Sequence, residues 1–212
     1  MKFNYRNQFS ELSTKTLRML PAELSHNIGL FLLRRNIFKI IPQPPKYYKD
    51  EQFHCSVPGV GKIANPICLA AGFDKNAGHI KSLSSLNFGM VEVGTVTPKP
   101  QGGNPKPRIF RYPNQKALIN RMGFNNVGSD QVRKNIDSEN TTETPLGINL
   151  GINKSTDIRK ASVDYTYGLD YFLGKGSYFV INVSSPNTNN LRDLASPNFI
   201  NQLSQDIDPE AR

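Results

Sequence analysis

Polar side chains that could do chemistry follow an apolar segment in the second half of the chain. The segment Tyr178–Val183 is mostly aromatic or β-branched, and Asn182, Ser184, Ser185 and Asn187 lie at its end. A buried parallel strand has this continuous apolar pattern, and ligands of α/β folds bind beyond the carboxyl ends of such strands. A serine hydroxyl could exchange a proton there, and the amides could hold a polar ligand. We therefore predict an active site at this strand end.

Other asparagines suggest that the ligand is polar and planar. Asn149 lies in the apolar segment Leu146–Leu150, as Asn182 lies in the later one. A buried amide that lacks a hydrogen-bond partner costs free energy. Two amides at the ends of neighbouring strands therefore favour one polar ligand that they share. Residues 120–126 place three asparagines and an arginine around one glycine. Amides donate and accept at once, as an imide ring requires, but asparagines also cap helices and form turns.

Two loops after predicted strands have a functional and a structural interpretation. Residues 70–78 are rich in small side chains, which let a flat ligand approach the backbone beside Lys75. A strand-to-helix turn with a solvated lysine explains the same residues. Residues 94–97 end the next predicted strand, and the loop 98–107 follows. The positive charges of Lys99 and Lys106 in this loop, and of Arg108 directly after it, are either functional or simply solvated.

Composition limits the class of protein. The chain has 212 residues, of which 37% are hydrophobic and 20% charged, as in a globular domain. Its net charge of +9 favours anionic ligands, an acidic membrane surface or nucleic acid. No Lys/Arg block with interleaved aromatic residues supports nucleic acid. No His/Cys/Asp/Glu cluster has metal-ligand spacing, so we predict no metal site. Cys68 lies in an apolar run and is expected to be a buried thiol, which fits a reducing compartment.

One short motif resembles a dinucleotide-binding fingerprint. Residues 59–64 match G-x-G-x-x-A, which needs a strand before it and a helix opening at it. Pro58 precedes the motif and Pro66 follows it, so neither condition is met. We predict a tight β-turn at this point.

Four apolar segments predict strands, and they alternate with segments long enough for crossover helices. The expected strands are 66–71, 90–96, 146–150 and 178–184. The expected helices are 80–86, 123–136 and 156–173. This alternation predicts an α/β fold, in which right-handed crossovers place all four strand ends on one face.

The amino-terminal region is predicted to form two short amphipathic helices. Apolar residues recur there at helical spacing: Leu12, Leu17, Leu20, Leu24, Ile28, Phe31 and Leu32. The polar faces are basic and carry Lys15, Arg18, Arg34, Arg35 and Lys39. Such helices either pack on the chain's own core or lie on an anionic membrane surface. Prolines exclude helix from residues 42–50, so we predict a helical pair over 1–41, a linker over 42–50 and a β/α domain over 51–212.

Four motifs in order point to one family. They are Ala-Ala-Gly-Phe-Asp-Lys at 70–75, Gly-Thr-Val-Thr-Pro at 94–98, Asn-Arg-Met-Gly-Phe-Asn-Asn at 120–126 and Asn-Val-Ser-Ser-Pro-Asn-Thr at 182–188. With them the chain resembles a dihydroorotate dehydrogenase of the membrane-associated, quinone-reducing class, from its first helix to about Leu194. The resemblance implies a (β/α)8 barrel that holds FMN, with the two helices forming a quinone entrance at the membrane surface. It also implies peripheral attachment to the cytoplasmic side of the cell membrane and a role in pyrimidine (UMP) synthesis.

The resemblance also assigns roles to residues. Those expected to hold the flavin are Ala71, Gly72, Phe73, Asp74, Lys75, Thr95, Asn149 and Asn182. Those expected to surround dihydroorotate or orotate are Lys75, Asn120, Arg121, Met122, Gly123, Phe124, Asn182 and Asn187. Ser185 would take the C5 proton as general base, and Phe124 and Thr188 resemble residues that line a proton path. The soluble class uses cysteine as its base, so Ser185 favours a quinone acceptor.

The number of strands departs from a full barrel. A (β/α)8 barrel typically takes about 250 residues, whereas four strands are predicted after the linker. The expected fold is therefore the amino-terminal half of the barrel, preceded by the two-helix domain, and we expect little or no activity from this chain alone. Two alternatives stay open. The chain is either a non-catalytic fragment, or half of a split protein whose partner chain supplies the missing half-barrel. Another flavin barrel with a different planar substrate is a further possibility.

Overall fold

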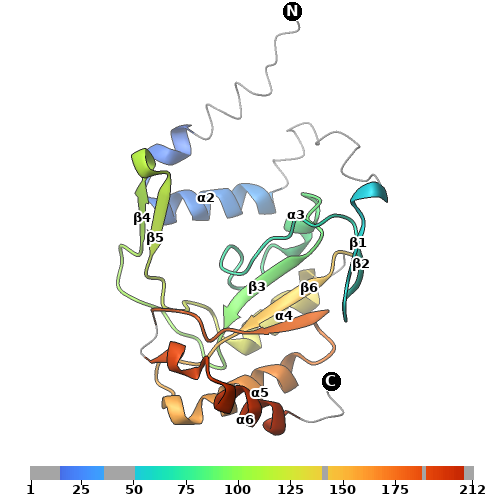
Figure 1. Cartoon of the computed structure of the whole chain (residues 1–212). Helices are drawn as coiled ribbons and strands as arrows, with labels where there is room; N and C mark the ends of the chain where they lie inside the picture. Colours follow the sequence, from blue (N-terminus) through green and yellow to red (C-terminus); the bar gives the residue numbers. More distant parts are fainter. Residues whose placement is uncertain (1–14, 36–50, 140–142, 188–189, 208–212) are drawn as a thin grey trace, which may run out of the picture. The chain divides into compact units, whose positions relative to one another are not determined.

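A computed structural model describes residues 15–35, 51–139, 143–187 and 190–207 (Figure 1). Leu12, Lys39, Thr188 and the predicted linker 42–50 lie outside these residues. The chain divides into two compact units. The first comprises Met1–Tyr47 and Pro105–Arg121, and the second comprises Tyr48–Asn104 and Met122–Arg212.

The first unit combines a helix with a β-hairpin. Residues 15–19 are helical, and α2 (Ala22–Arg34) follows. Strands β4 (Ile109–Tyr112) and β5 (Ala117–Asn120) pair antiparallel around the short 3-10 helix η4 (Pro113–Gln115). This hairpin was not predicted from the sequence.

A buried ion pair links the hairpin to α2 within the first unit. The Arg108 guanidinium donates to Glu23 Oε1 from Nε at 3.0 Å and from Nη2 at 2.6 Å. Arg108 is only 7% exposed. The interpretation of Arg108 as a solvated charge is therefore wrong, because the carboxylate of Glu23 compensates its burial.

The second unit begins with a small hairpin. After the 3-10 helix η3 (Glu51–Phe53), β1 (Cys55–Val57) pairs antiparallel with β2 (Gly61–Ile63). The Val60 amide donates to the Val57 carbonyl at 3.1 Å and closes the turn between the strands. The predicted tight turn is confirmed here.

A parallel sheet forms the centre of the second unit. Strands β3 (Val91–Val96), β6 (Leu146–Leu150) and β7 (Tyr178–Ile181) lie in the order β3-β6-β7, and both pairs are parallel. The first predicted strand, 66–71, forms only an isolated parallel bridge between Leu69 and Val91. Cys68 is exposed, so its predicted burial is wrong. The reason is that this irregular segment lies at the β3 edge of the sheet and buries little of its own surface.

Helices lie between the described strands in the predicted alternation and also follow the last of these strands. They are α3 (Ile80–Ser84), α4 (Ser129–Glu139), η5 (Ile158–Lys160), α5 (Ala161–Phe172), η6 (Leu191–Leu194) and α6 (Pro197–Asp206). Helix α4 starts later than predicted, because Gly123 and Phe124 have positive φ and the chain turns there. Helices α5 and α6 lie next to each other (Figure 1), and the Tyr165 and Phe199 rings meet edge to face at 6.0 Å. Helix α6 was not predicted from the sequence.

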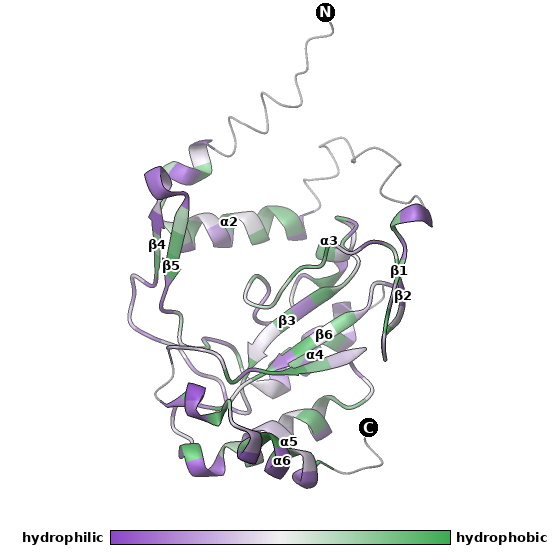
Figure 2. Ribbon diagram, in the orientation of Figure 1, coloured by the Kyte–Doolittle hydropathy of each residue, from purple (hydrophilic) through white to green (hydrophobic). Residues whose placement is uncertain are grey.

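The two faces of the parallel sheet differ in chemistry. Leu146, Ile148 and Leu150 of β6 are buried in the same core cluster as Tyr165 and Phe172 of α5. Figure 2 shows hydrophobic colouring along β6. Side chains alternate between faces in a strand, so the residues between these three belong to the opposite face. That face carries polar groups, among them Asn149.

Candidate active site

Polar side chains from the three parallel strands meet at the sheet's carboxyl end. The Thr95 hydroxyl donates to Asn149 Oδ1 at 2.6 Å. Asn182 Nδ2 donates to Thr95 Oγ1 at 3.1 Å and to Asn149 Oδ1 at 3.2 Å. Thr95 and Asn149 are buried, and Asn182 is partly buried. The structure thus brings together three residues that were predicted to hold the flavin.

The carboxylate of Glu92, which was not predicted from the sequence, extends this cluster. Asn149 Nδ2 donates to Glu92 Oε1 at 2.8 Å, and the Tyr178 hydroxyl donates to Glu92 Oε2 at 3.3 Å. Burial, together with the Glu92 carboxylate, raises the pKa of Tyr178 above its usual range. Tyr178 therefore remains protonated and remains a donor at neutral pH.

The predicted base lies in the segment after β7. Asn182 Oδ1 accepts from the Ser184 amide and from the Ser184 hydroxyl, both at 3.1 Å. Ser185 Oγ accepts from the Asn187 amide at 3.2 Å, and both residues are partly buried. The Tyr165 hydroxyl donates to the Asn182 carbonyl at 2.9 Å, so α5 supports this segment from the core. These bonds fix the backbone that carries Ser185.

The glycine-containing loop before α3 is held by one buried carboxylate. Asp74 is 2% exposed and accepts from the backbone amides of Gly78 at 3.1 Å and His79 at 2.8 Å. Lys75 Nζ donates to the Gly72 carbonyl. A Cβ added at Gly72 would meet no atom within 4 Å, so a flat ligand has access to the backbone there. Ala71 is partly buried and Phe73 is exposed.

A second amide cluster ties the neighbouring loops together and was also missed. Asn126 Nδ2 donates to Thr97 Oγ1 at 2.8 Å, and Asn153 Nδ2 donates to the same oxygen at 3.2 Å. Asn153 Nδ2 also donates to Gln101 Oε1 at 3.0 Å and to the Lys99 carbonyl at 2.8 Å. Three loops that follow β3, β5 and β6 are therefore fixed to one another beside the strand ends.

The segment 120–124 is divided between the two units. Asn120 and Arg121 belong to the first unit and are exposed, whereas Met122, Gly123 and Phe124 belong to the second. A Cβ added at Gly151 would lie 2.5 Å from Thr95 Cγ2 and 3.1 Å from Phe124 Cε2, so Phe124 lies beside the strand-end cluster.

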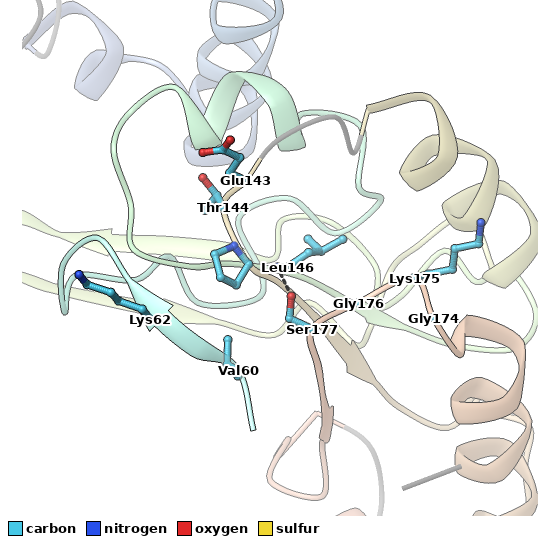
Figure 3. A pocket seen from close by; sticks show the side chains of 10 residues that line it. Val60, Lys62, Glu143, Thr144, Leu146, Gly174, Lys175, Gly176 and Ser177 are labelled. Atoms are coloured by element: carbon cyan, nitrogen blue, oxygen red, sulfur yellow. Dashed lines mark hydrogen bonds between the residues drawn. The ribbon is translucent and has the colours of Figure 1, made fainter. Parts of the chain in front are cut away.

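A cavity at the opposite end of the sheet contains none of the predicted site residues. Its volume is about 430 Å³, and it lies where β6 and β7 begin (Figure 3). Lys62, Glu143 and Ser177 are among its lining residues, and the Leu146 amide donates to Ser177 Oγ at 3.3 Å. Active sites of β/α barrels lie at the carboxyl ends of the strands, so we do not assign catalysis to this cavity.

A parallel β/α sheet with amides and hydroxyls at its carboxyl end is the arrangement in which β/α folds bind their ligands. A family model described as dihydroorotate dehydrogenase matches residues 54–207. The chain therefore belongs to the dihydroorotate dehydrogenase family. Members of this family are oxidoreductases that generally use flavin.

Individual relatives agree with this assignment. The chain is 48% identical over 155 residues to a dihydroorotate dehydrogenase (quinone) of Dechloromonas aromatica, covering 70% of this chain and 44% of that protein. It is 50% identical over 141 residues to the protein of that name from Nitratiruptor, covering 66% and 40%. A crystal structure of the Eimeria tenella enzyme with ferulenol superposes with a TM-score of 0.77 at 37% identity, covering 86% of this chain and 49% of that one.

These comparisons establish the fold and its extent. The fold is the amino-terminal part of the family's barrel with its preceding helices, as predicted. The chain spans less than half the length of the curated relatives just described. Among the described residues, no helix is long and apolar enough to span a membrane, and no cluster of potential metal ligands occurs.

Proposed function

We propose that this chain supplies the flavin- and substrate-binding strand ends of a quinone-dependent dihydroorotate dehydrogenase. The reaction is the oxidation of dihydroorotate to orotate in pyrimidine synthesis. One observation supports the proposal more strongly than the others. Thr95, Asn149 and Asn182 come from three adjacent parallel strands and form one hydrogen-bonded cluster at their carboxyl end. Relatives of the same family carry the name dihydroorotate dehydrogenase (quinone).

The residues at the strand ends fit FMN. Gly72 leaves the backbone open to a flat ring, while the clustered amides and the Thr95 hydroxyl provide donors and acceptors for its polar edge. The buried Asp74 holds the loop that carries Ala71, Gly72 and Phe73. FMN held by these residues would supply the hydride acceptor for the substrate and the electron donor for the quinone. The protein's part is to hold the ring and the substrate close together.

We assign the substrate to the loops around this cluster. Lys75 would pair with the substrate carboxylate, and it already reaches back toward the Gly72 carbonyl. In the second unit, the substrate ring would be surrounded by Met122, Gly123, Phe124, Asn182 and Asn187. Ser185 would remove the C5 proton, with its hydroxyl oriented by the Asn187 amide.

The first unit is proposed as the quinone entrance and the membrane contact. It exposes several large apolar side chains. Those at least 44% exposed are Met19, Leu24, Phe31, Tyr112, Leu118 and Ile119. Exposed apolar residues beside basic ones are typical of a surface that lies on an anionic membrane. This surface would attach the protein peripherally, on the cytoplasmic side of the cell membrane.

An alternative is that the chain works only with a partner chain. β7 is an edge strand of the described sheet, so a further parallel strand could pair with its free side. A second polypeptide that supplies the remaining strands would then complete the site. On this alternative the purified chain alone has little or no activity.

The test is a titration of the purified 212-residue chain with FMN, followed by flavin fluorescence, after which dihydroorotate is added. Saturable binding followed by bleaching supports a competent site. Ser185→Ala should leave FMN bound but slow bleaching by roughly 100-fold or more, because general-base catalysis typically contributes that much. Ser155→Ala, at an exposed turn, is the matched control and should bleach like the parent. Equal bleaching in Ser185→Ala would refute the base. An absence of binding would favour the partner-chain alternative.

A further inference from the structure

Glu92 has an unusual position for a carboxylate. It lies in β3 between the fully buried Val91 and Val93, and it is itself partly buried. Its two oxygens accept from two other strands of the sheet, from Asn149 Nδ2 of β6 at 2.8 Å and from the Tyr178 hydroxyl of β7 at 3.3 Å. An ionised carboxylate accepts hydrogen bonds and donates none. It can therefore bind only the donor end of any group that faces it.

This property fixes the orientation of the Asn149 amide. Because Glu92 requires a donor, Nδ2 of Asn149 must point to it and Oδ1 must point away. Oδ1 then accepts from the Thr95 hydroxyl at 2.6 Å and from Asn182 Nδ2 at 3.2 Å. The reverse orientation would place a carbonyl oxygen against the carboxylate, and an unpaired or repelled buried polar group is costly.

The orientation passes on to the next strand. With Asn149 Oδ1 and Thr95 Oγ1 both accepting from it, Asn182 presents Nδ2 to them. Its Oδ1 therefore faces the segment after β7, where it accepts from Ser184. A chain of hydrogen bonds therefore leads from Glu92 to the segment that carries Ser185, and each amide orientation in it sets the next.

We infer that Glu92 is a positioning residue, which sets the amide orientations of Asn149 and Asn182 and thereby the pattern of donors and acceptors that the strand ends offer a ligand. Its consequence for flavin rests on the proposed function; the amide orientations themselves do not. Glutamine has nearly the same size as glutamate but can either donate or accept. In Glu92→Gln the two orientations of Asn149 therefore become similar in energy, and the order of the cluster is lost.

The test is NMR of the side-chain amides in the purified chain without flavin. The signals are assigned by their disappearance in Asn149→Asp and Asn182→Asp. In Glu92→Gln, the signals of Asn149 and Asn182 should shift, and hydrogen exchange at Asn149 Nδ2 should rise about tenfold, because a bond to a charged group is lost. Glu143→Gln, at an exposed position, is the matched control and should leave both signals unchanged. Tyr178→Phe keeps the Glu92 carboxylate and should therefore preserve the amide orientations of Asn149 and Asn182. Unchanged amide signals in Glu92→Gln would overturn the inference.

The parent chain provides a check that does not depend on how the variant folds. Nuclear Overhauser contacts should join the Asn149 amide protons to the Glu92 side chain. Contacts from those protons to Thr95, with none to Glu92, would mean that the amide is reversed and the inference is wrong.

An FMN titration separates this inference from the proposed function. If the parent binds FMN, Glu92→Gln should weaken binding about tenfold, while Glu143→Gln should not. If the parent binds no FMN, the proposed function fails for the isolated chain, and the NMR result still decides the role of Glu92.

Discussion

Gly94 lies against the backbone of β6, next to the strand-end cluster. Its φ is +108°, and an added Cβ would lie 2.5 Å from the Asn149 carbonyl oxygen and 2.9 Å from the Val96 nitrogen. Both neighbours are backbone atoms and cannot turn aside. We expect Gly94→Ala to lower the free energy of unfolding by roughly 3 kcal/mol, through crowding and through the strained φ. Urea unfolding measures this change.

Gly78→Ala is the control for that substitution. Gly78 has an ordinary φ, and an added Cβ there meets no atom within 4 Å. The free energy of unfolding should therefore change by no more than about 0.5 kcal/mol. If both variants lose the same stability, the crowding at Gly94 is not the cause.

Site residues were predicted where one rule was applied, namely that a polar side chain within an apolar strand needs a polar partner. Residues to which this rule was not applied were missed. Polar side chains in apolar segments marked Asn149 and Asn182, and the structure joins them both directly and through Thr95. Glu92 breaks the apolar pattern of β3 in the same way, so the same rule could have found it. Thr97 and Asn153 gave no such signal, because they lie in the loops after β3 and β6 and not within an apolar strand.

At the scale of elements, α6 begins with a well-defined cap. Ser196 Oγ accepts from the Phe199 amide at 3.3 Å, and Pro197 occupies the first turn. Phe199 and Leu203 then attach the helix to the core cluster. Loss of an N-cap side chain typically costs about 1 kcal/mol. We expect Ser196→Ala to speed amide hydrogen exchange across α6 about fivefold, as measured by mass spectrometry.

Two further variants test the cap itself. Ser196→Asp keeps an acceptor at the cap and should restore slow exchange. Gln202→Ala changes an exposed residue of the same helix and should leave exchange nearly unchanged. Fast exchange in Ser196→Asp would mean that packing, and not the cap, holds the first turn.

Strands were predictable where the sequence is a continuous apolar run. The apolar segments of β3, β6 and β7 gave strands within a few residues of their observed bounds, although β7 is only partly buried. The hairpin β4–β5 was missed because β5 is exposed along its length and shows no burial pattern. Helix α6 was missed although Ser196-Pro197 is a recognisable helix start.

At the scale of the whole molecule, the protein combines an excess of positive charge with exposed apolar side chains. The net charge is +9, and two exposed arginines, Arg34 and Arg35, end α2. The Arg35 guanidinium lies over the ring of the exposed Phe31 at 5.3 Å from its centre. A basic group beside an aromatic ring at the end of an amphipathic helix suits the interface between lipid headgroups and acyl chains. The affinity of the proposed membrane contact should therefore depend on these positive charges, and variants that remove them test the proposal.

The purified chain should bind vesicles that contain phosphatidylserine and should bind phosphatidylcholine vesicles far more weakly. Each basic residue near an anionic surface contributes about 1 kcal/mol, so the double variant Arg34→Gln, Arg35→Gln should bind roughly 30-fold more weakly in a sedimentation assay. Raised salt should weaken the parent in the same direction, because it screens the surface potential. The control is Arg159→Gln, Lys160→Gln, which removes equal charge from exposed positions of the second unit. If both pairs weaken binding equally, net charge alone accounts for it, and the first unit has no special role at the membrane.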